Sequence, residues 1–146
     1  MAVFSPILSL NEVTPGSWFY RVGDAGSQLC FSATWSESSD TFLIVIEENG
    51  ARATRQMDNA ALYPVSQIDI KPNLDSARFG VPLRSGMLCA SEAQALLIFT
   101  MESMLCEVGI SDGICPQDAS NAITFSSWDL INYGLSGTRT LISVSV

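Results

Sequence analysis

The residue types that most often perform acid–base and nucleophilic chemistry are sparse in this chain of 146 residues, which contains no histidine. Without histidine the commonest general base and metal ligand are missing, and Ser–His and Cys–His nucleophile pairs are excluded. The single lysine, Lys71, precedes Pro72 in an expected loop, where nothing would desolvate and activate it. No glycine-rich phosphate-binding pattern occurs. The sequence therefore indicates neither a nucleophile–base pair nor a phosphate site.

Carboxylates are the remaining candidates for catalysis or metal binding, because two of them can meet in space from distant positions. Glu47 and Glu48 are adjacent, but neighbouring strand residues point to opposite faces and these two approach an expected turn. Asp112-Gly113, with Asp118 five residues beyond, is only weakly similar to a calcium loop, because the regular ligands and closing Glu are missing. We expect solvated turns at both places, and neither a catalytic residue nor a cofactor or metal.

The four cysteines, Cys30, Cys89, Cys106 and Cys115, are 59, 17 and 9 residues apart. Structural zinc sites usually take ligands in pairs two to four residues apart, and no histidine is present to complete a mixed site. We predict buried, reduced, metal-free thiols that pack as small apolar side chains. Cys106 and Cys115 close the shortest loop and would be the first pair to form a disulfide under oxidation.

Charge and hydropathy exclude several classes of partner. Seven basic against fifteen acidic side chains give a net charge of −8, with no basic cluster to neutralise phosphates or anionic lipid. The longest apolar run, at 95–99, is far shorter than the roughly 20 residues of a membrane helix. The start lacks a basic region and is interrupted by Pro6, so no signal peptide is expected. We expect a protein made in the cytoplasm that binds neither nucleic acid nor membrane.

Alternating polarity predicts a mainly β fold. In 28–35, Leu29, Phe31 and Trp35 share one face with period two, while 42–46 is apolar on both faces, as in a strand covered on both sides. Asn49-Gly50 predicts a type I′ hairpin turn, in which both residues have positive φ. Further expected strands are 17–22, 51–57, 65–70, 123–125 and 138–146, with 86–90 as a weaker candidate, and 71–82 is expected to be a long loop.

One stretch departs from the β pattern. Ser91 and Gln94 form a capping-box motif, and apolar residues recur at three- and four-residue spacing as far as Val108, before Gly109. We predict one α-helix over about 91–108. The alternative is a β-hairpin that turns at Glu102-Ser103, since 96–99 would also suit a buried strand.

The expected architecture is a compact antiparallel β-sandwich or barrel with that one helix, in a single domain spanning 1–146. The first residues, about 1–12, form an extended N-terminal arm, because Pro6 bars both a regular helix and a central strand. The arm is apolar and needs a covering surface. We therefore predict that it binds a partner subunit through Val3, Phe4, Ile7, Leu8 and Leu10.

The first functional hypothesis is a non-enzymatic structural subunit of a large assembly, a homo-oligomer or a larger particle. The particle expected is a virion, in which the chain would be a capsid decoration protein or a head–tail component. The first alternative is a carbohydrate- or peptide-binding β-sandwich module, in which Trp18, Trp35 and Trp128 could stack on sugars, although core packing is the ordinary role of such residues. The second alternative is a carboxylate-dependent hydrolase, which needs two acidic groups converging in a cleft.

Overall fold

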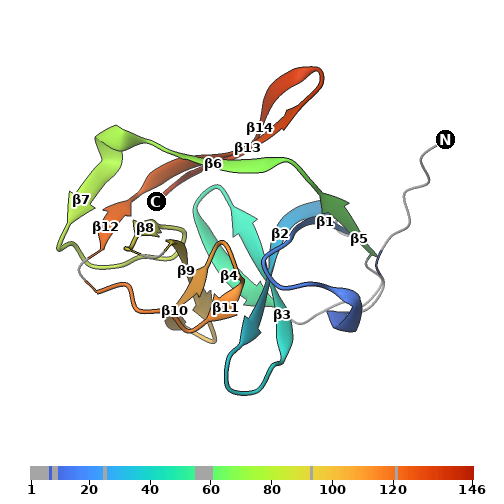
Figure 1. Cartoon of the computed structure of the whole chain (residues 1–146), viewed down its shortest axis with the longest axis horizontal. Helices are drawn as coiled ribbons and strands as arrows, with labels where there is room; N and C mark the ends of the chain where they lie inside the picture. Colours follow the sequence, from blue (N-terminus) through green and yellow to red (C-terminus); the bar gives the residue numbers. More distant parts are fainter. Residues whose placement is uncertain (1–6, 8–9, 25, 55–60, 93, 121) are drawn as a thin grey trace.

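The computed structural model describes residues 7, 10–24, 26–54, 61–92, 94–120 and 122–146. Within these ranges the protein is mainly β, with two sheets in a sandwich-like arrangement, so the predicted fold class is confirmed. Figure 1 shows a small three-stranded sheet lying above a larger, strongly curved sheet. The described residues include no helix that is long and apolar enough to cross a membrane.

The first half of the chain builds a meander at one end of the large sheet, in the spatial order β5-β1-β2-β3-β4. Neighbouring strands in it are antiparallel. The short 3₁₀ turn η1 (Leu10–Glu12) precedes it. The strands are β1 (Trp18–Gly23), β2 (Gly26–Trp35), β3 (Thr41–Glu47), β4 (Gly50–Thr54) and β5 (Ala61–Val65).

The rest of the large sheet comes from the second half of the chain and is joined to β4 through one parallel pair, Arg52 with Thr100. Its path continues β9-β8-β12-β7, with β10 paired to β9 and the short β11 paired to β2. The strands are β7 (Ala77–Phe79), β8 (Leu88–Ala90), β9 (Ala95–Met101), β10 (Met104–Gly109), β11 (Ile114–Cys115) and β12 (Ile123–Phe125), with the 3₁₀ turn η2 (Leu74–Ser76) just before β7.

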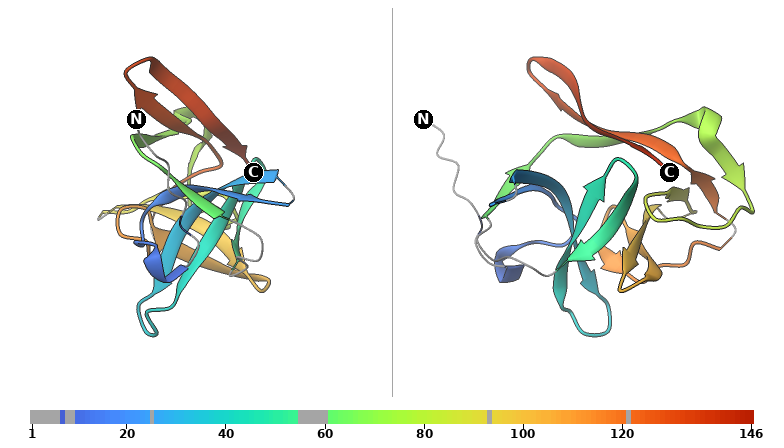
Figure 2. Two further views of the ribbon diagram at one scale, coloured as in Figure 1. Left: turned by 90° about the vertical axis from the view of Figure 1, so that its right-hand side faces the viewer. Right: turned by 180° about the vertical axis from the view of Figure 1, so that it is seen from behind.

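The small sheet has the order β14-β13-β6 and consists of β6 (Ile68–Pro72), β13 (Ser127–Gly134) and β14 (Gly137–Ser145). All its neighbours are antiparallel, and the β13–β14 register shifts between Leu130 and Ile131. Figures 1 and 2 both show the turn end of the β13–β14 hairpin projecting away from the rest of the molecule.

Two layers of apolar side chains fill the space on either face of the central strands. The predicted period-two face of β2 and β3 lies in the main core between the sheets, with Phe31, Phe42 and Ile44 completely buried and Trp35 packed at its edge. Leu43 and Val45, on the other face of β3, pack in a second cluster with Phe19. The prediction that 42–46 is covered on both sides is therefore confirmed.

The predicted helix over 91–108 is wrong, and the alternative hairpin is correct. β9 and β10 pair from Met101–Met104 to Leu96–Gly109, and the turn residues Glu102 and Ser103 have φ of 50° and 70°. Ser91 and Gln94 do bond to each other, but in a turn that leads into β9. The strand prevails because the side chains of 96–99 are buried on both faces, whereas a surface helix would turn one face to water.

Three local predictions also need correction. The β3–β4 hairpin forms, but Glu47 pairs with Gly50, and neither Asn49 nor Gly50 has a positive φ, so the turn is not type I′. The expected strand 65–70 is interrupted at Gln67 (φ 56°), between β5 and β6. The expected loop 71–82 contains η2 and β7. The predicted strand 51–57 is β4 as far as Thr54, and 55–57 lies outside the described residues.

Candidate interaction surface

Buried side chains of both strands anchor the base of the β13–β14 hairpin. Trp128 and Leu130 of β13 and Val144 of β14 are at most 1% exposed. The indole Nε1 of Trp128 donates a buried hydrogen bond of 2.7 Å to the carbonyl oxygen of Gly86. The hairpin is therefore fixed to the core at this end.

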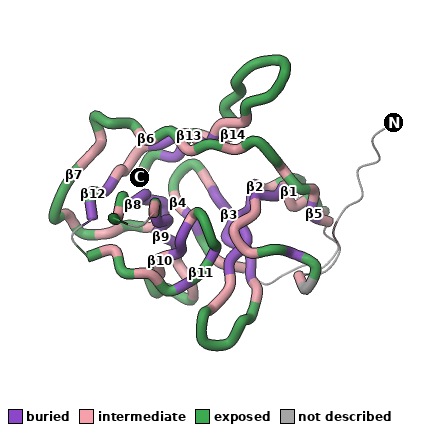
Figure 3. The backbone as a smooth tube through the Cα atoms, viewed as in Figure 1, coloured by how far each residue is buried: buried purple, intermediate pink, exposed green. Residues whose placement is uncertain are grey.

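The far end of the hairpin leaves the core. Gly134 and Gly137 pair across the turn, and Gly137 has φ of +107°, a conformation that glycine adopts without strain. Between them Leu135 is fully exposed, and Tyr133 just before the turn is half exposed. Figure 3 shows this loop as continuously exposed. Turns usually carry small or polar residues, so turn chemistry gives no reason for a leucine at this tip.

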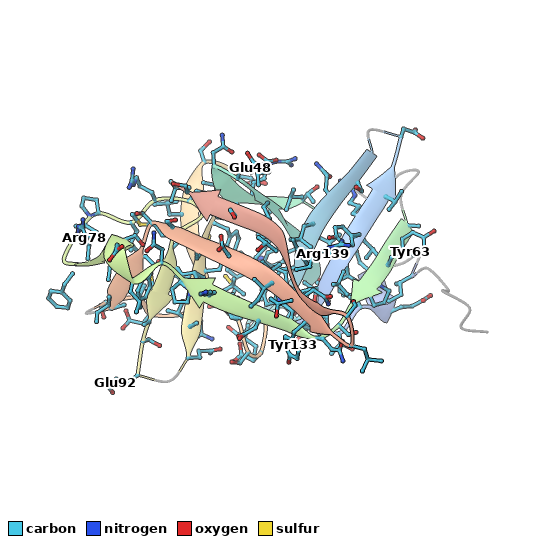
Figure 4. The ribbon with its side chains drawn as sticks, turned by 90° about the horizontal axis from the view of Figure 1, so that it is seen from above. Glu48, Tyr63, Arg78, Glu92, Tyr133 and Arg139 are labelled. Carbon is cyan, nitrogen blue, oxygen red and sulfur yellow. The ribbon has the colours of Figure 1, made fainter. Side chains whose placement is uncertain are left out.

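The side chain of Asn132 holds the exposed part of the hairpin over the β5–β6 turn. Its Nδ2 donates a hydrogen bond of 2.7 Å to the carbonyl oxygen of Ser66, and the N–H of Tyr133 bonds to the carbonyl of Gln67. Tyr133 and Arg139 lie on the two strands of the hairpin, as Figure 4 shows from above. No described carboxylate forms an ion pair with Arg139. The tip thus combines apolar groups with an unpaired cation.

An apolar cleft of about 310 Å³ opens between the small sheet and β8. Its main lining residues come from β1, β6, β8 and β12: Trp18, Ile68, Ile70, Leu88, Ala90 and Phe125. Asp69 of β6 also borders the cleft: its exposed side chain lies on the opposite face of the strand from Ile68 and Ile70, and its Oδ1 accepts a hydrogen bond of 2.9 Å from the N–H of Ile70. The cleft therefore offers an apolar interior, with one acidic residue at its border.

The apolar lining of this cleft continues onto the surface. Ile123 on β12 pairs with Ala90 on one side and with Phe79 of β7 on the other. Side chains at paired positions share one face of a sheet, so these three form a row leading out of the cleft. Phe79 is 69% exposed and Ile123 45%. The row is an exposed apolar strip beside a cleft, the kind of surface that protein contacts use.

A second cleft, of about 410 Å³, contains two carboxylates, Glu107 on β10 and Asp118. Partial burial, and to a smaller extent the charge of Asp118, raise the pKa of Glu107. Hydrogen bonds from Ser120, one of them 2.8 Å from its N–H, lower the pKa of Asp118. Opposite shifts in two neighbouring carboxylates suit one proton donor and one charged group. Sequence reasoning missed the pair, because Asp118 was considered only with Asp112 as a weak calcium-loop pattern and Glu107 lies in no motif.

The carboxylates singled out from the sequence have other roles. Glu47 forms an ion pair of 3.1 Å with Arg52. Asp112 accepts hydrogen bonds from the N–H of Ile114 and from the side chain of Gln94. Among the described residues, no three acidic or thiol side chains are grouped closely enough to hold a metal ion.

The tryptophans do not form an exposed platform. Trp18 and Trp128 are buried in the core, and Trp35 packs against Phe42 with ring centroids 5.6 Å apart. Core packing is the ordinary role of such residues, and these tryptophans therefore do not provide the exposed aromatic surface that the sugar-binding alternative requires.

All four cysteines are free thiols, and Cys30, Cys89 and Cys115 are buried while Cys106 is half-buried. The prediction of buried thiols is therefore confirmed for three of them. Burial raises the pKa of Cys30 and Cys89 to about 11 and that of Cys115 to about 12. These thiols stay protonated at neutral pH and are poor nucleophiles.

The predicted partner-binding arm is only partly described. Ile7 forms a two-hydrogen-bond bridge with Leu62 of β5, at 2.8 and 2.9 Å, and with Leu10 it packs half-buried on the cluster around Leu43 and Val45. Val3, Phe4 and Leu8 lie outside the described residues. The two described members thus contact other parts of their own chain, and a contact of the arm with another subunit stays a prediction.

Sequence reasoning also missed β13 and therefore the projecting hairpin. The available signal was the pair of glycines three residues apart, Gly134 and Gly137, between two β-rich runs. Comparison with protein families, with curated proteins and with solved structures found no match for the chain. The candidate surface must therefore be interpreted from its own chemistry.

Proposed function

We propose that this chain is a non-enzymatic structural subunit of a large protein assembly. The observation that carries the proposal is the projecting β13–β14 hairpin, which is anchored in the core at Trp128 and presents a fully exposed Leu135 at its tip. An exposed apolar side chain at the end of an extension adds little to the stability of its own fold, but it buries apolar area when another protein covers it.

The finer part of the proposal is that the assembly is a virion, with the chain as a capsid decoration or head–tail component. Two features of one small domain support it: the hairpin and the apolar N-terminal segment that contains Val3 and Phe4. Two contact elements, far apart in the sequence, would let each copy meet more than one neighbour, as a shell or tube of repeated subunits requires.

The test is the state of the untagged protein in its native source. The proposal predicts that the chain sediments with particles much larger than its own 15.7 kDa, and that Leu135→Ser releases it from them. Leu74→Ser is the matched control, because Leu74 is also largely exposed but lies on η2. A chain recovered from its source as a free monomer would contradict the proposal, and a particle without nucleic acid would contradict its virion part.

A second candidate function, a carboxylate-dependent hydrolase, is favoured by the cleft that contains Glu107 and Asp118. In that function Glu107 would hold the proton and Asp118 would stay charged. Chromogenic glycosides and esters test it, with Glu107→Gln and Asp118→Asn as the inactive variants. Glu102→Gln, at the exposed β9–β10 turn, is the control. Turnover that the two variants leave unchanged would remove this candidate.

A further inference from the structure

The hairpin tip combines an exposed apolar side chain with a nearby cation. Leu135 is fully exposed in the turn, and Arg139 lies two residues beyond Gly137 on β14, about 7 Å further along the strand at 3.3–3.4 Å per residue. A surface complementary to this tip must have an apolar pocket for the leucine side chain. It must also have an acidic group at the rim of the pocket, where the arginine would lie.

The cleft between β6 and β8 on this same chain offers that combination. An apolar cavity of about 150 Å³ holds a benzene molecule, so the 310 Å³ here leaves room for a leucine side chain. Asp69 borders the cleft, where its Oδ1 accepts a hydrogen bond from the N–H of Ile70, and no described cation pairs with its carboxylate. The unpaired Arg139 and the unpaired Asp69 are therefore complementary charges on the two surfaces.

The free edge of β6 makes strand addition a poor way to fill this cleft. The N–H of Asn73 donates to the carbonyl of Ser127, and the N–H of Tyr133 donates to the carbonyl of Gln67, so the odd-numbered residues of this stretch form the hydrogen-bonded pairs with β13. Hydrogen-bonded pairs alternate along an antiparallel ladder, and the N–H of Ile70 therefore points away from β13. That N–H already donates to the carboxylate of Asp69, and Pro72 has no N–H that could bond to an added strand. An inserted side chain suits the site better than an added strand.

We propose that the protein assembles head to tail, with Leu135 of one copy entering the cleft between β6 and β8 of the next copy. Arg139 of the first copy then pairs with Asp69 of the second, and the row Ala90–Ile123–Phe79 extends the contact outward. The proposal rests on the assembly function above and names its partner. Because tip and cleft are different surfaces, the contact is heterologous and produces a ring or an open chain of copies.

Two variants that each remove one half of the contact test the proposal. Leu135→Glu disables the tip and leaves the cleft intact. Ala90→Trp fills the cleft from an exposed strand position and leaves the tip intact. Light scattering and sedimentation should show a wild type whose mass exceeds 15.7 kDa and rises with concentration, and two monomeric variants. An equimolar mixture of the variants should form a 1:1 dimer, since one good tip and one good cleft remain.

Milder variants measure the strength of the contact. Leu135→Ser should raise the dissociation constant about thirtyfold or more, the size expected for a central interface residue. Arg139→Glu and Asp69→Arg should each weaken association, and mixing the two should restore it. Leu74→Ser and Ser38→Trp, at exposed positions outside both surfaces, serve as controls and should associate like the wild type. Circular dichroism verifies that each variant is folded.

The outcomes separate this proposal from the proposed function. If folded Ala90→Trp associates like the wild type, or if the mixture of the two disabled variants stays monomeric, the cleft is not the acceptor and the head-to-tail proposal is wrong. A wild type that stays monomeric at millimolar concentration overturns it as well. In each case the structural-subunit function is still decided independently, by whether the native chain is found in a particle and released from it by Leu135→Ser.

Discussion

Replacing Trp128 by phenylalanine should destabilise the whole domain through one buried hydrogen bond. Trp128 is 1% exposed, and its Nε1 donates to the carbonyl oxygen of Gly86 at 2.7 Å. Phenylalanine fills most of the same space but has no N–H. The buried carbonyl of Gly86 then loses its side-chain donor, in a place that water does not reach.

The expected loss follows from two contributions. Leaving a buried acceptor without its partner costs about 1–3 kcal/mol. Reducing an indole to a phenyl ring in a filled core leaves a void that adds about 1–2 kcal/mol. Together the free energy of unfolding should fall by about 2–5 kcal/mol. With a urea m-value of about 1.5 kcal/mol/M, the midpoint moves down by about 1–3 M.

Urea unfolding followed by far-ultraviolet circular dichroism measures this loss, and Trp35→Phe is the matched control. Trp35 is half-buried and contacts Phe42 through tilted rings, a contact that phenylalanine can keep, so about 1 kcal/mol or less should be lost. If the two variants lose the same stability, or if Trp128→Phe loses less than about 1 kcal/mol, the reasoning from the buried hydrogen bond is refuted.

Three further predictions concern local packing and ionisation. Gly86→Ala should lower the free energy of unfolding more than Gly137→Ala, as urea melts would show. Gly86 has φ of +92° and an added Cβ would lie 2.9 Å from Gly50 Cα, whereas Gly137, with φ of +107°, has nothing within 4 Å. Burial raises the pKa of Cys30 from 9.0 to about 11, so the folded state holds this proton more tightly than the unfolded state. The resulting stabilisation is complete below pH 9 and is lost between pH 9 and 11. Urea midpoints across that range should therefore fall less steeply in Cys30→Ala than in the wild type, and equal slopes would contradict the raised pKa. Partial burial raises the pKa of Glu107, because its charged form is unfavourable in the folded state. The wild type therefore loses free energy of unfolding as Glu107 ionises between pH 3 and 7, and Glu107→Gln should become more stable relative to the wild type over that range. A difference between the two proteins that does not change with pH would show that the Glu107 pKa is the same folded and unfolded.

Several elements could be predicted from the sequence because their determinants are local. The alternation through Leu29, Phe31 and Trp35 specifies one buried face of a strand, and the apolar run 42–46 specifies a strand covered on both faces. These patterns depend only on the backbone period, which is the same in every fold. The burial of Cys30, Cys89 and Cys115 could be predicted for a similar reason, because a reduced cysteine packs as a small apolar side chain.

The hairpin of β9 and β10 shows where local signals are insufficient. The Ser91–Gln94 motif and the spacing of apolar residues satisfy a helix as well as they satisfy a turn and a strand. Burial of 96–99 on both faces decides between them, and that burial is supplied by residues such as Ala122 and Phe42, distant in the sequence. Tertiary packing therefore overrode the local preference.

The candidate surface was decided almost entirely by tertiary structure. Gly134 and Gly137 are enough to indicate a turn, but whether Leu135 lies in a core or in water depends on what the rest of the chain places around it. The cleft needs Trp18, Ile70, Leu88 and Phe125 from four separate strands, and the carboxylate cleft needs Glu107 and Asp118 to meet. Sequence alone determined which residues are apolar and which alternate, because those properties belong to single residues and their neighbours. Only the folded chain determined which apolar residues stay uncovered, because exposure is what remains after every other segment has packed.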